Sequence, residues 1–267
     1  MKTDAEISRL LRPVRALALE AGAEIMKYYK GEMGVRRKDD ASPVTDADEA
    51  AEAIILPALR ALTPDIPVVA EEAMSAGAEV DVSGGRFWLV DPLDGTKEFI
   101  AHRDEFTVNI ALVVDGAPVL GVVHAPALAL TYAAAGPGTA TVERGGAAPA
   151  PIAVRAAPAG GVVAVGSRSH GDREKMQALL SHLPIAEVKV AGSSIKFGLV
   201  ACGEADIYPR YGHTREWDTA AGHAVLRAAG GSVRSLDGAE MVYGKPHFLN
   251  DEFIARGRDD PAENAGT

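Results

Sequence analysis

The sequence has little cysteine, fewer basic than acidic residues and no long apolar run. Cys202 is the only cysteine, so no internal disulfide can form, and its surroundings GLVACGEAD predict a core position. Twenty-seven Lys and Arg stand against 37 Asp and Glu, which gives a net charge of −10. That negative field opposes binding to a nucleic acid polymer or an anionic membrane, although a local cation cluster could still bind a small anion.

The opening segment MKTDAEISRLLRPVRALALE carries acids early and spaces its apolar residues at helical intervals. It predicts an amphipathic helix rather than a signal peptide or a transmembrane segment, and we therefore expect a cytoplasmic protein. The 267 residues, 47% hydrophobic and 24% charged, predict one large or two closely packed units with a substantial core.

Several catalytic patterns are missing. The chain has no Gly-x-Ser-x-Gly elbow, which disfavours a serine hydrolase, and Gly136-Pro137-Gly138 lacks the third glycine of a dinucleotide-binding loop. The histidines show no metal-ligand spacing.

Helical and strand patterns interleave without a repeat, which predicts an α/β, or layered α+β, fold. Expected helices cover residues 7–25, 46–62, 172–183, 193–202 and 218–229, with Thr45 or Asp46 capping the second. Expected strands cover residues 66–70, 87–90, 107–114, 119–124, 130–134, 162–165 and 205–209. A Gly-, Ala- and Pro-rich stretch at 136–161 predicts an N-terminal subdomain at 1–140, a C-terminal one at 155–255 and a flexible tail at 256–267.

The strongest local pattern is DPLDGT at 91–96, which follows an apolar strand. We expect Pro92 to stop the strand and Gly95 to allow a tight turn. That turn would bring the carboxylates of Asp91 and Asp94 together, and a hard divalent cation would relieve their repulsion. Magnesium suits this sparse spacing, whereas a calcium EF-hand does not. Taken alone, both aspartates could instead be turn or helix-cap residues.

With its neighbours, DPLDGT resembles the first signature of the inositol monophosphatase superfamily. The segment WDTAAG at 217–222, followed by AGG at 229–231, resembles the second. Glu71-Glu72 and PVTDAD at 43–48 extend the resemblance over roughly residues 5–250. It implies the α/β/α/β/α sandwich of the inositol monophosphatase and fructose-1,6-bisphosphatase type.

The resemblance implies two or three Mg²⁺ ions in each active site. Glu71, Asp91 and the carbonyl of Leu93 would hold one ion, and Asp91, Asp94 and Asp218 a second, so that Asp91 bridges them. One ion would activate a water and the other would stabilise the departing oxygen, with no covalent phosphoenzyme.

Proton transfer is assigned by the same resemblance. Thr96 and Asp48 would help to accept the proton of the attacking water, and Glu71 would orient that water. Asp46 is the alternative to Asp48, but the family spacing Val-Thr-x-x-Asp favours Asp48.

Gly95 and Thr96 stand at an expected helix start, where free N–H groups favour a phosphate. The sequence GTKEF at 95–99 resembles the 3′(2′),5′-bisphosphate nucleotidase branch, since inositol monophosphatases more often read GTTNF. The further substrate-binding residues that this branch implies are His170, Ser193, Lys196 and Arg210. A cation at Arg210, where inositol monophosphatases typically place an acid, favours a second anionic group.

The implied activity is magnesium-dependent hydrolysis of adenosine 3′,5′-bisphosphate to AMP, in the context of sulfate assimilation and with sensitivity to lithium. Use of the sulfated form, 3′-phosphoadenylyl sulfate, stays open. The alternatives are an inositol 1-phosphate or fructose 1,6-bisphosphate phosphatase and, more remotely, a non-catalytic phosphate-ligand-binding protein. Monomer and homodimer both stay open, and peripheral association with the inner membrane rests on the resemblance alone.

Overall fold

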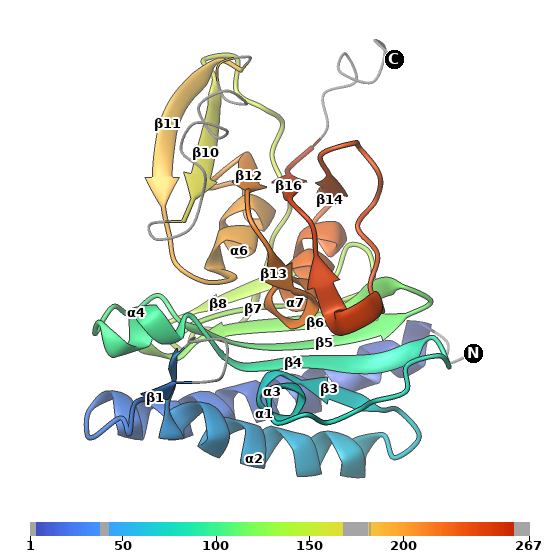
Figure 1. Cartoon of the computed structure of the whole chain (residues 1–267). Coiled ribbons are helices and arrows are strands. Elements are labelled where there is room, and N and C mark those ends of the chain that lie inside the picture. The colour runs from blue at the N-terminus through green and yellow to red at the C-terminus, as the bar shows by residue number, and fades with distance from the viewer. Residues whose placement is uncertain (1–3, 38–42, 168–180, 182, 259–267) are drawn as a thin grey trace.

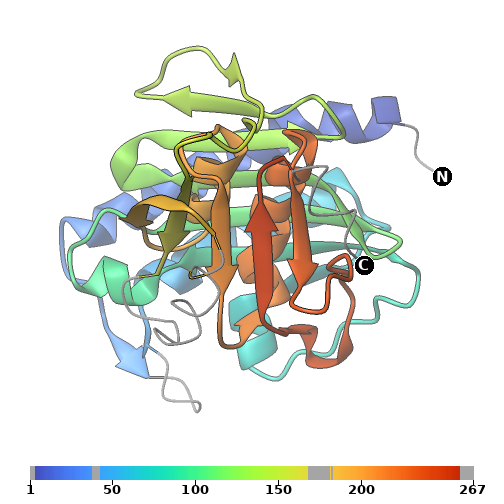
Figure 2. The ribbon, with the colours of Figure 1, turned by 90° about the horizontal axis from the view of Figure 1, so that it is seen from above.

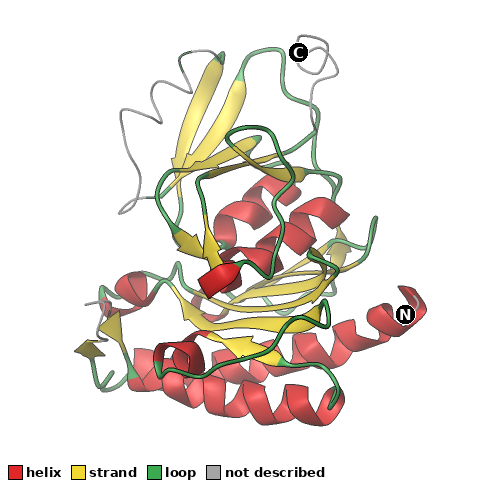
Figure 3. Cartoon of the chain, turned by 45° about the vertical axis from the view of Figure 1, so that its right-hand side comes forward, coloured by secondary structure: helices red, strands yellow, loops and turns green. Residues whose placement is uncertain are grey.

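The computed structural model describes residues 4–37, 43–167, 181 and 183–258. These residues form stacked layers of helices and sheets (Figure 1). A pair of long helices, α1 and α2, covers one face of a seven-stranded sheet, and α6 and α7 lie between that sheet and a five-stranded one. Figure 3 shows the same alternation of helix and strand layers. The predicted layered α+β class is confirmed.

The helices and strands interleave along the chain. The helices are α1 (Asp4–Tyr29), α2 (Asp46–Leu62), α3 (Glu71–Ser75), α4 (Thr96–Ile100), α6 (Ile195–Ala201) and α7 (Glu216–Ala228), with short 3₁₀ turns η1 (Pro126–Leu128) and η2 (Pro246–Phe248). The strands are β1 (Arg36–Arg37), β2 (Pro43–Val44), β3 (Val68–Ala70), β4 (Arg86–Asp94), β5 (Thr107–Val114), β6 (Ala117–Ala125), β7 (Leu130–Ala135), β8 (Thr141–Arg144), β9 (Ala150–Pro151), β10 (Val162–Gly166), β11 (Ile185–Val190), β12 (Ile207–Arg210), β13 (Thr214–Arg215), β14 (Ser232–Ser235), β15 (Leu249–Asn250) and β16 (Phe253–Arg256).

The seven-stranded sheet has the order β3-β4-β5-β6-β7-β8-β9 and is antiparallel except for the β3–β4 pair. Both of its faces are covered. Along β4, Phe87 and Leu89 join the core between the two sheets, whereas Trp88 and Val90 join the core beneath α1 and α2. Because successive side chains point to opposite faces, burial on both sides explains why this strand is apolar from Phe87 to Val90.

The prediction that Pro92 stops β4 is wrong. The strand continues to Asp94, and its pairing with β5 jumps from Asp91 opposite Asn109 to Asp94 opposite Thr107. One extra residue on β4 is therefore accommodated as a bulge, where a proline without an N–H is tolerated. The bulge carries the chain directly into the tight turn at Gly95.

The five-stranded sheet has the order β11-β10-β12-β16-β14, and its strands run across those of the sheet below (Figure 2). Helices α6 and α7 pack against each other closely between the two sheets. A Cβ added at Gly222 on α7 would lie 2.4 Å from the ring of Phe197 on α6. Gly222, the glycine of the second signature, is thus required by the close packing of α6 against α7.

The boundaries of several elements differ from the expected ones. The helix expected at 193–202 is confined to α6, because Ser193 has a left-handed φ of 44°. The helix expected at 218–229 begins earlier, at Glu216, since the Asp218 carboxylate accepts a hydrogen bond from the backbone N–H of Arg215 and so caps the helix from inside its first turn. The strands that were not predicted are short or carry charged side chains: β1, β2, β8, β9, β11, β13, β14, β15 and β16.

The predicted helix at 172–183 falls almost wholly outside the described residues. The division into subdomains stays a prediction, and β8 and β9 continue the first sheet past residue 140. The predicted tail begins within β16, and residues 259–267 of it lie outside the described part of the chain.

Candidate active site

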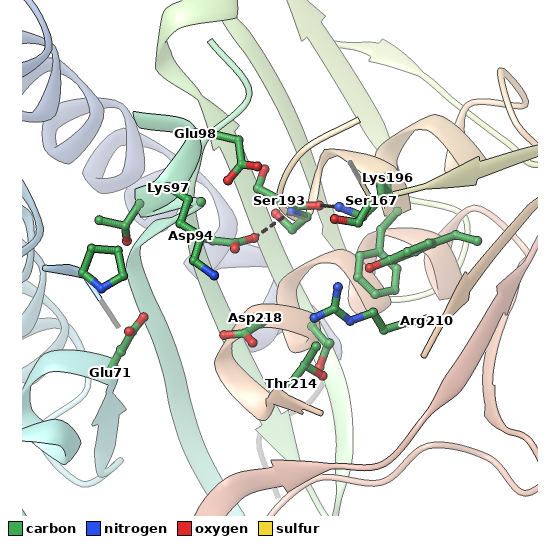
Figure 4. Close-up of a pocket in the computed structure, with 17 residues that line it drawn as sticks. Glu71, Asp94, Lys97, Glu98, Ser167, Ser193, Lys196, Arg210, Thr214 and Asp218 are labelled. Atoms are coloured by element: carbon green, nitrogen blue, oxygen red, sulfur yellow. Dashed lines mark hydrogen bonds between the residues drawn. The ribbon is translucent and has the colours of Figure 1, made fainter. Parts of the chain in front are cut away.

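Three carboxylates from separate elements converge beside the end of β4. Glu71 opens α3, Asp91 lies on β4, and Asp218 lies in the first turn of α7. One oxygen of each lies within 4.8 Å of the others. Figure 4 shows Asp94 and Asp218 in the middle of a pocket, with Glu71 on one side and Lys196 and Arg210 on the other.

The cluster is electrostatically unfavourable without a cation. Burial, followed by the neighbouring charges of Glu71 and Asp94, raises the pKa of Asp91 well above its ordinary value. Burial and the same neighbours also raise the pKa of Asp218. Among the described residues, the three grouped ligand atoms are all carboxylate oxygens, and a hard divalent cation would offset their repulsion, so the three carboxylates fit a magnesium ion.

Backbone hydrogen bonds orient two of these carboxylates. The N–H of Leu93 donates to Asp91 Oδ1 at 3.0 Å, and the N–H of Arg215 donates to Asp218 Oδ2 at 2.8 Å. Each of these two carboxylates therefore has one oxygen held by a backbone N–H of its own turn.

Asp94 lines the same cavity but does not belong to the close trio. Its Oδ2 accepts the backbone N–H of Ser194 at 2.7 Å. Burial raises the pKa of Asp94 to about 6, with Lys196 opposing that shift. The carbonyl of Leu93, the other predicted metal ligand, accepts the hydroxyl of Thr96 at 3.3 Å.

The structure favours Asp48 over Asp46 beside the site. Asp48 is 2% exposed, and its Oδ2 accepts the N–H and the hydroxyl of Thr45. Its Oδ1 lies 3.3 Å from the Thr96 hydroxyl, which can donate its single proton either to Asp48 or to the carbonyl of Leu93. Asp46 instead pairs with Arg36 at the surface. The cap of α2 is Thr45, one of the two predicted residues.

Gly95 makes the turn between β4 and α4. Its φ of 93° is in the left-handed region, and an added Cβ would lie 3.2 Å from the carbonyl oxygen of Glu105. Only glycine meets both conditions without strain, which places Thr96 at the first position of α4.

The cavity has a volume of about 230 Å³. Its wall opposite the carboxylates carries the cations Lys196 and Arg210. Lys196 is 3% exposed, and burial lowers its pKa to about 8 while Asp94 opposes that shift. Its ammonium donates to the carbonyl of Ser193 at 2.5 Å. Within the part of the chain that the structure describes, Ser193 Oγ and Arg210 Nε are buried and have no hydrogen-bond partner, and both residues line the cavity. His170 lies outside the described residues.

The model of the inositol monophosphatase family matches residues 6–261. The chain belongs to the inositol monophosphatase family. Within this family it is 50% identical over 247 residues to the 3′(2′),5′-bisphosphate nucleotidase CysQ of Salmonella typhimurium, a match that covers 91% of this chain and 98% of that protein. CysQ of Escherichia coli K12 is 49% identical with the same coverage.

Solved structures of the family agree with the fold. CysQ from Bacteroides thetaiotaomicron superposes with a TM-score of 0.77 at 35% identity, covering 91% of this chain and 95% of that one. An inositol monophosphatase from Anabaena superposes with a TM-score of 0.74 at 28% identity, covering 95% and 92%. Within the described part of the chain, no helix is long and apolar enough to cross a membrane.

Sequence reasoning missed the buried residues that support the site. Glu52 is 7% exposed and accepts the backbone N–H groups of Glu72 and Ala73 at 2.9 and 3.0 Å, in the first turn of α3. The sequence feature that could have identified Glu52 is its position four residues after Asp48, which places both acids on the same, mainly apolar, face of α2. Asn109 was a second signal, since it is an amide within the apolar strand β5.

Proposed function

We propose that this protein is a magnesium-dependent 3′(2′),5′-bisphosphate nucleotidase, which converts adenosine 3′,5′-bisphosphate to AMP and phosphate. The observation that carries the proposal is the 50% identity to a nucleotidase of that name along 98% of its length. The cavity supports it, because a carboxylate cluster on one wall faces the buried Lys196 and the half-buried Arg210 on the other. A cytoplasmic location and a role in sulfate assimilation belong to the same proposal.

Glu71, Asp91 and Asp218, with Asp94 and the carbonyl of Leu93, would hold the magnesium ions. Bound there, magnesium would supply Lewis acidity to the phosphate and to the attacking water. Hydrolysis breaks the bond between phosphorus and the 3′ oxygen, the oxygen of water takes its place on phosphorus, and the 3′ oxygen takes up a proton and leaves as the 3′ hydroxyl of AMP.

The remaining steps fall to side chains and backbone groups of the chain. The Thr96 hydroxyl and the Asp48 carboxylate would accept the proton released by water, while Glu71 orients that water. The backbone N–H groups of Gly95 and Thr96 would bind the reacting phosphate.

The non-reacting phosphate would bind the cationic wall. Ser193, Lys196 and Arg210 line this wall, and among the described residues Ser193 Oγ and Arg210 Nε have no hydrogen-bond partner. An inositol monophosphate has no second phosphate to bind there, which is why this wall favours the nucleotide. His170 belongs to the same proposal by resemblance only.

The test is phosphate release from adenosine 3′,5′-bisphosphate, inositol 1-phosphate and fructose 1,6-bisphosphate at equal concentration with magnesium. We expect much faster phosphate release from the nucleotide than from the other two substrates. A chelator should abolish this release, and so should the substitution Asp94→Asn. Comparable rates on all three would leave a general sugar phosphatase. Tight binding without release of phosphate would indicate a binding protein and overturn the proposal.

A further inference from the structure

Four polar side chains form one hydrogen-bonded chain behind the cationic wall. Thr107 and Asn109 are alternate residues of β5, so they point to the same face of the sheet. The hydroxyls of Thr107 and Ser194 lie 2.8 Å apart. Ser194 Oγ lies 2.6 Å from Asn109 Oδ1, and Asn109 Nδ2 lies 3.5 Å from Asp94 Oδ2. Thr107 and Asn109 have no exposed surface, and Ser194 is 2% exposed.

The chain runs in one direction. The Asp94 carboxylate only accepts, so the amide nitrogen of Asn109 faces it and the amide oxygen faces Ser194. The single hydroxyl proton of Ser194 then goes to Asn109, and the hydroxyl of Thr107 must donate to Ser194. Asp94 also accepts a hydrogen bond from the backbone N–H of Ser194. Ser194, Asn109 and Asp94 are therefore joined in a closed ring of hydrogen bonds.

The ring holds a strained turn. Ser193, immediately before it, has a φ of 44°, a region that residues other than glycine rarely adopt and that persists only when the surroundings enforce it. The carbonyl of Ser193 anchors the Lys196 ammonium, and its buried hydroxyl lines the cavity. The position of this turn therefore determines where the Ser193 hydroxyl and the Lys196 ammonium lie in the cavity.

We propose that Asn109 is a positioning residue that holds this turn so that Ser193 and Lys196 contact the non-reacting phosphate of the substrate. The inference rests on the proposed function and assigns the origin of its selectivity. Of the four hydrogen-bonded residues, Asn109 and Thr107 do not line the cavity, so they act through Ser194 rather than by touching substrate.

The experiment compares the wild type with Asn109→Leu, which keeps the approximate size of the side chain but can form no hydrogen bond, and with Thr107→Val, which removes only the first donor. The probe is AMP, the product that carries the non-reacting phosphate alone, titrated by calorimetry with magnesium present. The affinity for AMP should fall about tenfold in Asn109→Leu and about threefold in Thr107→Val. Thr131→Val is the matched control, because Thr131 is also buried and hydrogen-bonded in this sheet, but to His124, and should bind AMP as the wild type does.

Kinetics provide the second readout. In Asn109→Leu the KM for adenosine 3′,5′-bisphosphate should rise about tenfold, while the KM for adenosine 3′-monophosphate changes less than about twofold. An equal rise for both nucleotides, or unchanged AMP affinity in both variants, overturns the positioning role. If Asn109→Leu does not fold, Thr107→Val decides. If the wild type hydrolyses neither nucleotide, the proposed function fails, whereas the AMP titration still tests the turn.

Discussion

The hydroxyl of Thr96 lies 3.3 Å from the carboxylate of Asp48, although 48 residues separate them in the sequence. Because this pair is proposed to accept the proton of water, Asp48→Asn should lower kcat by about 10²- to 10⁴-fold. Asp46→Asn, two residues earlier and paired at the surface, is the control and should keep kcat within about twofold. Steady-state kinetics decide, and equal losses in the two variants would contradict the assignment.

Metal binding should stabilise the protein by relieving the repulsion at Asp91. At a magnesium concentration about 100 times its dissociation constant, we expect a rise in Tm of about 5–10 °C. The side-chain amide oxygen in Asp91→Asn could still accept the hydrogen bond from the N–H of Leu93. The metal-free variant should therefore melt no lower than the metal-free wild type and should not respond to magnesium. Calorimetry of both proteins with and without a chelator tests this; a metal-free variant that melts far lower would refute it.

Glu52 should determine metal affinity through Glu71. Its carboxylate caps the first turn of α3, where Ala70 has no side chain able to do so. In Glu52→Gln, the side-chain NH₂ group would face one of these two backbone N–H groups, so that two donors oppose each other and one hydrogen bond is lost. Because this shifts the first turn of α3, which carries Glu71, Mn²⁺ binding should weaken by about 10- to 100-fold. Free Mn²⁺ measured by electron paramagnetic resonance gives the affinity without relying on turnover. Glu49→Gln, at an exposed position of the same helix, should bind Mn²⁺ normally.

The contact between α6 and α7 should tolerate no Cβ at Gly222. The added carbon would lie 2.4 Å from the Phe197 ring, so Gly222→Ala should destabilise the protein by about 1–3 kcal/mol through overpacking. Gly84 has open space around an added Cβ and no left-handed φ, and Gly84→Ala should be neutral or stabilising by up to about 1 kcal/mol. Urea unfolding measures both, and similar values for the two would argue against the packing role.

Buried His223 should make stability depend on pH. Burial, with Arg227 and Lys245 nearby, lowers the pKa of His223 from 6.5 to about 3, and its Nδ1 lies 3.0 Å from the Tyr243 hydroxyl. The unfolded chain therefore binds a proton that the folded protein excludes, so this contribution is complete above pH 6.5 and falls by up to about 1.4 kcal/mol per pH unit as the pH drops toward 3.

The matched measurement is the free energy of unfolding at about pH 7 and about pH 5 in the wild type and in His223→Gln. Contributions of the carboxylates cancel in the comparison. The variant should lose about 2 kcal/mol less than the wild type over this interval. Parallel curves for the two proteins would show that His223 does not supply the dependence.

Elements with strong periodicity or long uniform runs were predicted closely. The helix at 46–62 and the strand at 107–114 have the predicted bounds, since each is long and most of its buried side chains are apolar. Where a local rule competed with a tertiary contact, prediction was less accurate. Pro92 follows the rule that proline ends a strand, but a bulge accommodates it within β4.

The amino-acid pattern alone predicted the family, the layered fold class and the residue types of the proposed metal site, because the two signatures keep acids, a glycine turn and a threonine at characteristic spacing. Which of these groups meet in space depended on tertiary packing. Glu71, Asp91 and Asp218 converge from three elements, and Asn109 reaches the Ser193 turn from the other sheet. Such contacts depend on how layers far apart in the chain pack, and no local spacing records that.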